Sequence, residues 1–287
     1  TANTSPVPIL RAAVEILETY PVPSEIPTGE FWQMAYHPRV LDLLCRLREG
    51  LIADCSTDER RGLRAILLGA LHGPMPKTKN SYFSNQCPRT FAPKPNYAVG
   101  FWKSRGLAAR NVSVLGIIAE RAIRYFGTET SLSPASTIVA GDCTDPSSFL
   151  DLPIDNKFAW TITSPPYYGM TTYIADQWLR NWFVGGPDRV DYSTKTQVCH
   201  GSPELFASDL KKTWLNVRAV SHNGDRLVIR FGSINNRKAD PGEIIKESLR
   251  NTGWKIQTIR SAGIPKKGRR QAETFTSLTT PVNEFDI

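Results

Sequence analysis

An apolar run that stops at two consecutive prolines constrains the fold of this chain more than any other feature. Residues Phe158 to Ile162 are mostly β-branched or aromatic, a composition that predicts a buried β-strand. Pro165 and Pro166 follow, and the strand must end before them because proline cannot donate a backbone hydrogen bond within a sheet. The turn therefore lies at the carboxyl end of a strand, where open α/β sheets bind their ligands.

The residues of this turn, Thr163-Ser164-Pro165-Pro166-Tyr167, resemble the catalytic motif of S-adenosylmethionine-dependent DNA amino-methyltransferases. These enzymes methylate N4 of cytosine or N6 of adenine. The resemblance implies that the Ser164 hydroxyl and the Pro165 carbonyl accept the two hydrogens of an exocyclic amine, so that its nitrogen turns a lone pair toward the methyl group. Tyr167 would stack on the base after its extrusion from the duplex. Acceleration would come from positioning and preorganised dipoles, with Pro166 keeping the turn rigid.

An ordinary proline-rich turn could have the same residues without this chemistry, and the flanking sequence separates the two interpretations. We interpret Ile138–Asp142, which ends in Gly-Asp, as the preceding strand of the sheet. The family places an acidic residue there beside the cofactor's adenine, and the resemblance assigns cofactor contacts to Asp142, Cys143 and Thr163. It extends over residues 136–287. Further along the chain we expect a helix near 204–220, a strand at 225–231, a helix at 241–251 and a strand at 254–260.

One element of the family is missing from the sequence. Members bind the methionine end of the cofactor in a Phe-x-Gly-x-Gly turn after the first strand, and no segment of this chain has that pattern. The Phe–Gly neighbours that do occur are isolated pairs without a second glycine, at Gly100-Phe101, Phe126-Gly127 and Phe231-Gly232. The chain therefore resembles the part of a methyltransferase that carries the catalytic motif, without the part that carries the cofactor turn.

The sheet of the family has the strand order 3-2-1-4-5-7-6. This chain offers candidates for strand 3 (138–142), strand 4 (158–163), strand 5 (226–231) and a C-terminal hairpin for strands 6 and 7. Without strands 1 and 2, backbone edges would be open in the middle of the sheet, which is unfavourable. We expect an α/β fold with a Rossmann-like methyltransferase sheet in the C-terminal half, its central strands 1 and 2 supplied by a partner chain. The alternative is that residues 1–135 hide two strands.

The N-terminal half has the spacing of amphipathic helices. A segment rich in Thr, Ser and Pro at 127–136 suggests a boundary, so we expect a helical region at 1–135 and a methyltransferase domain at 136–287. Thr1 is a residue that commonly follows a removed initiator methionine, and we expect a natural start here; a piece of a longer protein is the alternative. The predicted helices are Val7–Glu18, Arg39–Leu51, Gly62–Leu71 and Val112–Phe126.

The net charge of +8 is unevenly distributed. No Asp or Glu occurs between Arg60 and Ala119, and between Lys77 and Arg105 the cations alternate with aromatic residues. Cations neutralise phosphates and aromatic rings stack on bases, so we predict a basic, aromatic-rich insert for double-stranded DNA at 72–110; a solvated charged face is the alternative. The residues predicted to contact DNA are Lys77, Lys79, Arg89, Lys94, Lys103 and Arg105, with Lys266, Lys267, Arg269 and Arg270 in a second acid-free stretch.

The remaining composition excludes several classes of protein. Five cysteines lack the CxxC spacing and four histidines are scattered, so we predict free thiols in a reducing compartment and no metal site. No Pro-Cys dipeptide occurs, which argues against methylation of cytosine C5 by a cysteine nucleophile. No run approaches the roughly 18 to 20 apolar residues of a membrane span, and we expect a cytoplasmic protein associated with the nucleoid.

Together these patterns predict a subunit of a site-specific DNA methyltransferase in a restriction–modification or related defence system. Ser164 at the first motif position favours cytosine N4, whereas relatives acting on adenine N6 more often have Asp or Asn there. Three alternatives remain: adenine N6, a non-catalytic DNA-binding subunit with a vestigial motif, and methylation of RNA or of a protein glutamine. We expect S-adenosylmethionine as cofactor and a second subunit that carries the Phe-x-Gly-x-Gly turn.

Overall fold

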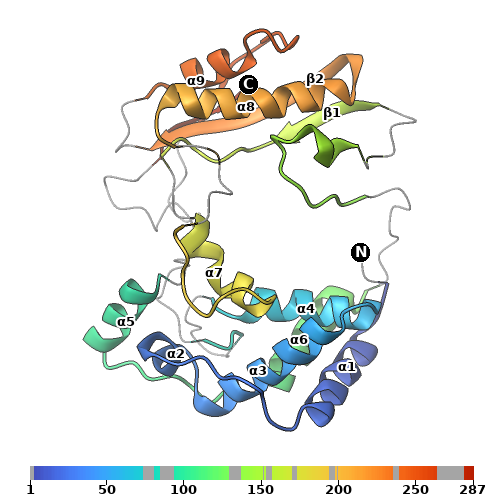
Figure 1. Ribbon diagram of the computed structural model, residues 1–287, viewed down its shortest axis with the longest axis vertical. Helices are drawn as coiled ribbons and strands as arrows, with labels where there is room; N and C mark the ends of the chain where they lie inside the picture. Colours follow the sequence, from blue (N-terminus) through green and yellow to red (C-terminus); the bar gives the residue numbers. More distant parts are fainter. Residues whose placement is uncertain are drawn as a thin grey trace. The chain divides into compact units, whose positions relative to one another are not determined.

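The chain forms two compact units (Figure 1). Unit 1 comprises Thr1–Leu132 and Thr172–Tyr192, and unit 2 comprises Ser133–Thr171 and Ser193–Ile287. A computed structural model describes residues 3–73, 81–84, 94–128, 137–150, 152, 157–169, 173–193, 198, 200–234, 239–263 and 281–287. Within these residues the fold is α/β, as predicted: helices and a small mixed sheet of four strands.

All secondary-structure elements in the described residues of unit 1 are helices. The helices begin where the sequence offers caps: Thr57 accepts a hydrogen bond from the Arg60 N–H, and Ser113 accepts one from the Gly116 N–H. The four predicted helices are confirmed to within a few residues, except that α4 begins earlier, at Asp58. The helices are α1 (Pro6–Thr19), α2 (Glu30–Ala35), α3 (Pro38–Ala53), α4 (Asp58–Ala70), α5 (Pro95–Ser104), α6 (Val114–Phe126) and α7 (Tyr173–Phe183).

An aromatic cluster joins α7 to the N-terminal helices of unit 1. Trp32 of α2 lies 4.6 Å from Trp182 and 5.5 Å from Trp178, measured between ring centroids. Its indole Nε1 donates a hydrogen bond to the backbone carbonyl of Asp188 at 3.1 Å. Residues 172–192 therefore belong to unit 1, although they follow the Pro165-Pro166 turn of unit 2 in the chain. Each unit therefore consists of two separate segments of the chain. The single predicted boundary between residues 135 and 136 does not contain this second crossing.

The sheet of unit 2 has the order β1-β2-β4-β3. β1 runs parallel to β2, whereas β4 is antiparallel to both β2 and β3. Helices α8 and α9 pack against each other and against β2 (Figure 1). The elements are η1 (Pro146–Phe149), β1 (Phe158–Thr163), α8 (Pro203–Ala219), β2 (Ser221–Ile234), α9 (Pro241–Leu249), β3 (Arg260–Gly263) and β4 (Pro281–Asp286).

The core of unit 2 lies between this sheet and the two helices. Ile229 and Phe231 of β2 are buried among Phe206 and Trp214 of α8 and Ile245 of α9. The Trp214 indole N–H donates to the Ser248 hydroxyl at 2.9 Å, so the polar atom of this buried ring is satisfied. The helices predicted near 204–220 and 241–251 are confirmed as α8 and α9.

β1 departs from the buried strand that its apolar sequence predicts. Among the described residues it pairs on one side only, with β2. Trp160 is 54% exposed and Ile162 is 77% exposed. Their neighbours in register are Arg226 and Val228 of β2. Side chains alternate between the two faces of a strand, and the alternate residues of β2 (Leu227, Ile229 and Phe231) pack toward the helices. Trp160 and Ile162 therefore lie on the sheet face away from α8 and α9.

Two predicted strands are wrong. Residues 137–142 form no strand, and Ile138 is 86% exposed, because a strand needs a neighbour and the described residues provide none there. The strand predicted at 254–260 begins only at Arg260, where pairing with β4 begins, at Asp286. In both segments the apolar pattern was present, but backbone pairing decided where a strand formed.

Candidate functional site

The candidate site is the turn that follows β1. Thr163 ends the strand in register with Ile229 of β2, and Ser164 is exposed directly after it. Pro165 and Pro166 are half-buried. The two prolines end the strand as predicted, and the turn leaves the Ser164 hydroxyl accessible at the carboxyl end of a parallel strand pair.

Tyr167 is held by two other strands of the sheet. Its ring packs edge-on against Phe231 of β2, with the centroids 5.7 Å apart and the planes at 77°. Its hydroxyl donates a hydrogen bond to Glu284 Oε1 of β4 at 2.7 Å. Because one end of the ring is fixed by packing and the other by a charged acceptor, the ring has a set orientation while remaining half-exposed.

A second layer of residues supports the turn. Tyr168 is buried against Phe206 of α8, 5.6 Å between centroids, and stacks with His200 at 6.3 Å. His200 Nδ1 accepts a hydrogen bond from the Gly169 N–H at 3.0 Å, and Gly169 has φ of +84°, which favours glycine. Sequence reasoning did not assign a role to Tyr168, His200 or Glu284. The His200-Gly201 pair after the motif is the local signal that could have pointed to this layer.

An ion pair joins β2 and β4, the two strands that hold Tyr167. Arg230 of β2 makes a bidentate ion pair with Asp286 of β4, with Nε–Oδ1 at 2.7 Å and Nη2–Oδ2 at 2.8 Å. The hydrogen bond from Arg230 lowers the pKa of Asp286, and the same bond raises the pKa of Arg230. This pair cross-links β2 and β4 beside Glu284, the acceptor of the Tyr167 hydroxyl.

The segment of Asp142 and Cys143 packs against α8 through Cys143. The Cys143 carbonyl accepts from Asn216 Nδ2 at 3.0 Å, and its Sγ lies 3.5 Å from Thr213 Oγ1. Thr213 is about two turns, or ~10 Å, further along α8 than Phe206, which contacts Tyr168. The predicted cofactor residues therefore fall in two places: Thr163 at the motif, and Asp142 with Cys143 near the middle of α8.

The Asp142 carboxylate is engaged in a local turn. Its Oδ1 accepts from both the backbone N–H and the hydroxyl of Thr144, each at 2.8 Å. Such side-chain to backbone bonds compete with strand pairing, which agrees with the absence of a strand at 137–142. Asp145 repeats the pattern by accepting from the Ser147 N–H at 2.9 Å and capping η1.

Three of the predicted DNA-contacting cations lie at the two ends of α5. Lys94 is half-buried at its N-terminus. At the other end Lys103 forms an ion pair with Glu30, and the Arg105 guanidinium lies 3.8 Å from the centroid of the Phe101 ring. The other predicted cations lie outside the described residues: Lys77, Lys79, Arg89, Lys266, Lys267, Arg269 and Arg270.

Comparisons with protein-family models, curated proteins and solved structures find no match to this chain. The described residues hold no group of three or more His, Cys, Asp or Glu that could bind a metal ion. Among the described helices, none is long and apolar enough to cross a membrane. The geometry around Ser164 and Tyr167 is therefore the basis on which a function can be proposed.

Proposed function

We propose that this chain is the subunit of an S-adenosylmethionine-dependent DNA amino-methyltransferase that carries the catalytic motif, with cytosine N4 as the acceptor. The observation that carries the proposal is the sheet order β1-β2-β4-β3, with Ser164–Tyr167 at the carboxyl end of β1. In order, β1, β2, β4 and β3 correspond to strands 4, 5, 7 and 6 of the family. The strand that comes last in the chain, β4, lies antiparallel beside β2, as strand 7 lies beside strand 5. The motif does not dictate that arrangement, so the order supports the proposal independently of the motif.

The turn has the acceptors that the reaction needs. An exocyclic amine is a poor nucleophile because its lone pair is delocalised into the ring. The exposed Ser164 hydroxyl and the Pro165 carbonyl would accept its two hydrogens and favour a pyramidal nitrogen. The oriented, half-exposed ring of Tyr167 would stack on the extruded base. Because these groups are fixed before the base arrives, they would stabilise the transition state without reorganisation.

The described residues fit only part of S-adenosylmethionine. Thr163 and Ser164 lie at the strand end where the methyl group would be presented, whereas the Asp142 carboxylate is bonded to Thr144 and lies elsewhere on unit 2. No described segment has the glycine-rich turn that would hold the methionine end. When bound, the cofactor supplies an electrophilic methyl group. The residues of this chain would orient the acceptor nitrogen toward it.

Among the residues that the structure describes, one side of β1 has no neighbouring strand, and this edge supports a heterodimer. Edge strands and large exposed apolar side chains such as Trp160 and Ile162 mark surfaces that another polypeptide covers. The described residues of unit 1 are helical and supply no strand for this edge. We therefore propose that a partner chain adds strands 1 and 2 together with the Phe-x-Gly-x-Gly turn, through the large apolar interface of an obligate complex.

Mass spectrometry of nucleosides tests the function. DNA is incubated with S-adenosylmethionine and this chain, with and without the products of neighbouring genes. We expect N4-methylcytosine only when the partner is present. Ser164→Ala should lower the rate by about 10²-fold, as for the loss of one preorganised hydrogen-bonding group, while DNA affinity stays unchanged. Ser208→Ala, at an exposed position of α8, is the matched control. N6-methyladenine would redirect the proposal to adenine, and no methylated nucleoside from a folded complex would reject it.

A further inference from the structure

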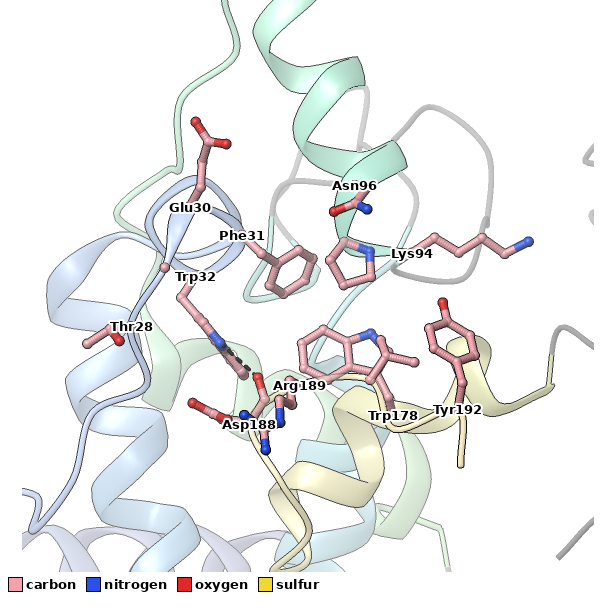
Figure 2. A pocket seen from close by; sticks show the side chains of 13 residues that line it. Thr28, Glu30, Phe31, Trp32, Lys94, Asn96, Trp178, Asp188, Arg189 and Tyr192 are labelled. Atoms are coloured by element: carbon pink, nitrogen blue, oxygen red, sulfur yellow. Dashed lines mark hydrogen bonds between the residues drawn. The ribbon is translucent and has the colours of Figure 1, made fainter. Parts of the chain in front are cut away.

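Unit 1 contains a cleft lined by aromatic rings and built from other residues than the Ser164–Tyr167 turn (Figure 2). Its volume is about 330 Å³, at the small end of the range for ligand pockets. Phe31 and Trp32 come from α2, Trp178 from α7, and Tyr192 from the segment after α7. Figure 2 shows the rings of Phe31, Trp178 and Tyr192 gathered around the cleft. A site of this size and lining suits one planar ring system.

The inner walls of the cleft are fixed. Phe31 and Trp178 pack at 64° with their centroids 5.1 Å apart, and Trp32 packs against Trp178 at 76°. These three rings are buried, and the Trp32 indole N–H is bonded to the Asp188 carbonyl. Tyr192 differs, because its side chain is 68% exposed at the rim. A ligand would therefore meet rigid apolar walls and one accessible ring face.

Two cations and two carboxylates line the cleft. The cations are Lys94 and Arg189, and Figure 2 shows Lys94 extending outward on the same side as Tyr192. The carboxylates are Asp188 and Glu30, and that of Glu30 is ion-paired with Lys103. Lys94 further belongs to the 60–119 stretch that has no acidic residue. Aromatic rings beside cations are the combination that binds the bases and phosphates of unstacked nucleic acid.

We propose that this aromatic cleft binds an unstacked nucleobase of a DNA strand, with Tyr192 stacking on the base and Lys94 and Arg189 contacting adjacent phosphates. The choice of DNA rests on the proposed function. The site lies on unit 1, is built from other residues than the Ser164–Tyr167 turn, and needs neither cofactor nor partner chain. It would hold the strand while the chemistry takes place on unit 2.

Photocrosslinking tests the proposal on the full chain. A single-stranded oligodeoxynucleotide containing 5-iododeoxyuridine is irradiated with the protein, and the crosslinked residue is identified by mass spectrometry. We expect the crosslink at Tyr192. Tyr192→Ala should remove it and weaken binding by about 5- to 150-fold, since one stacked base contributes that much. Tyr125→Ala is the matched control, because Tyr125 is another exposed tyrosine of unit 1, 53% exposed on α6.

Charge variants test the phosphate contacts. Lys94→Gln and Arg189→Gln should each reduce the slope of log affinity against log salt by about 0.7, the value per phosphate contact for a single strand. Arg11→Gln, at an exposed position of α1, should leave it unchanged. Crosslinks outside the cleft together with wild-type affinity of Tyr192→Ala would overturn the proposal, as would tighter binding of RNA of the same sequence. A chain that crosslinks at Tyr192 but yields no methylated nucleoside would reject the catalytic function alone.

Discussion

The Tyr167 hydroxyl donates a 2.7 Å hydrogen bond to Glu284 Oε1, although 117 residues separate the two in sequence. Tyr167 follows β1 and Glu284 lies in β4, with β2 between the two strands. Phe231 of β2 packs against the edge of the same tyrosine ring. The turn that carries the candidate catalytic residues is thus held by β2 and β4, the next two strands after β1 in the sheet order, and its geometry depends on their order.

Tyr167→Phe separates the contribution of the hydrogen bond to Glu284 from the contribution of the aromatic ring. Removing the hydroxyl should lower the free energy of unfolding by about 1 to 2 kcal/mol, because a hydrogen bond to a charged acceptor disappears at a half-buried position. The ring remains, so DNA affinity should stay near wild type, whereas Tyr167→Ala should weaken it by roughly 1–3 kcal/mol. Urea unfolding and DNA titration measure the two effects. If Tyr167→Phe and Glu284→Ala destabilise additively in a double-mutant cycle, the hydrogen bond contributes nothing.

Ile162→Lys probes the exposed face of β1, which lies away from α8 and α9 beside the strand's edge. Because Ile162 is 77% exposed, we expect the stability of the chain alone to change by no more than about 0.5 kcal/mol. Assembly with the partner should fail, since a charge would be placed in an apolar interface. Leu215→Lys, at a 44% exposed position of α8, is the control. Sedimentation velocity of the mixed chains decides the matter, and a complex of unchanged stoichiometry and affinity would contradict the docking of a partner on β1.

Neutralising the predicted DNA-contacting cations in pairs should flatten the salt dependence of binding to double-stranded DNA. Removing one cation that neutralises a phosphate should reduce the slope of log affinity against log salt by about 0.9. The pairs are Lys77 with Lys79, Arg89 with Lys94, and Lys103 with Arg105. We expect the smallest change for the third pair, because Lys103 is ion-paired with Glu30. Fluorescence anisotropy at several salt concentrations gives the slopes, and one constant slope throughout would mean that these cations form a solvated face.

His72 should make unit 1 sensitive to acid. Burial, together with the nearby Arg180 cation, lowers the pKa of His72 to about 4, and its Nε2 has no hydrogen-bond partner among the described residues. An unfolded histidine has a pKa near 6.5, so between these values the unfolded chain binds a proton that the folded chain does not. Stability is therefore retained above pH 6.5 and falls as the pH drops toward 4, by on the order of 2 kcal/mol between pH 7 and 5.

The control for this prediction is a histidine with a different environment. His72→Gln should remove most of the pH dependence, whereas His222→Gln, at an exposed position of β2, should leave it as in the wild type. Urea unfolding at pH 7 and pH 5 measures the difference for each variant. Equal losses of stability in the wild type and in His72→Gln would show that another group titrates.

Features encoded within a few residues could be predicted from the sequence. The prolines at 165 and 166 stop β1 wherever it lies in the sheet. The spacing of apolar residues located the helices of unit 1 to within a few residues, although the Thr57 cap, which starts α4 at Asp58, was not recognised. Helices expected near 204–220 and at 241–251 form as α8 and α9. These signals act through local backbone geometry and hydrogen bonds, which neighbouring residues determine by themselves.

Only the tertiary structure decided which strand-like sequence patterns formed strands and which distant side chains formed a site. Ile138–Asp142 has a strand-like composition but no neighbouring strand among the described residues, whereas the short β3 pairs with β4 and therefore forms. Glu284 acquires its role at Tyr167 from strand order, and the aromatic cleft gathers rings from segments more than 100 residues apart. A β-strand and a composite site both depend on contacts with distant residues, and the sequence by itself does not specify which distant residues meet.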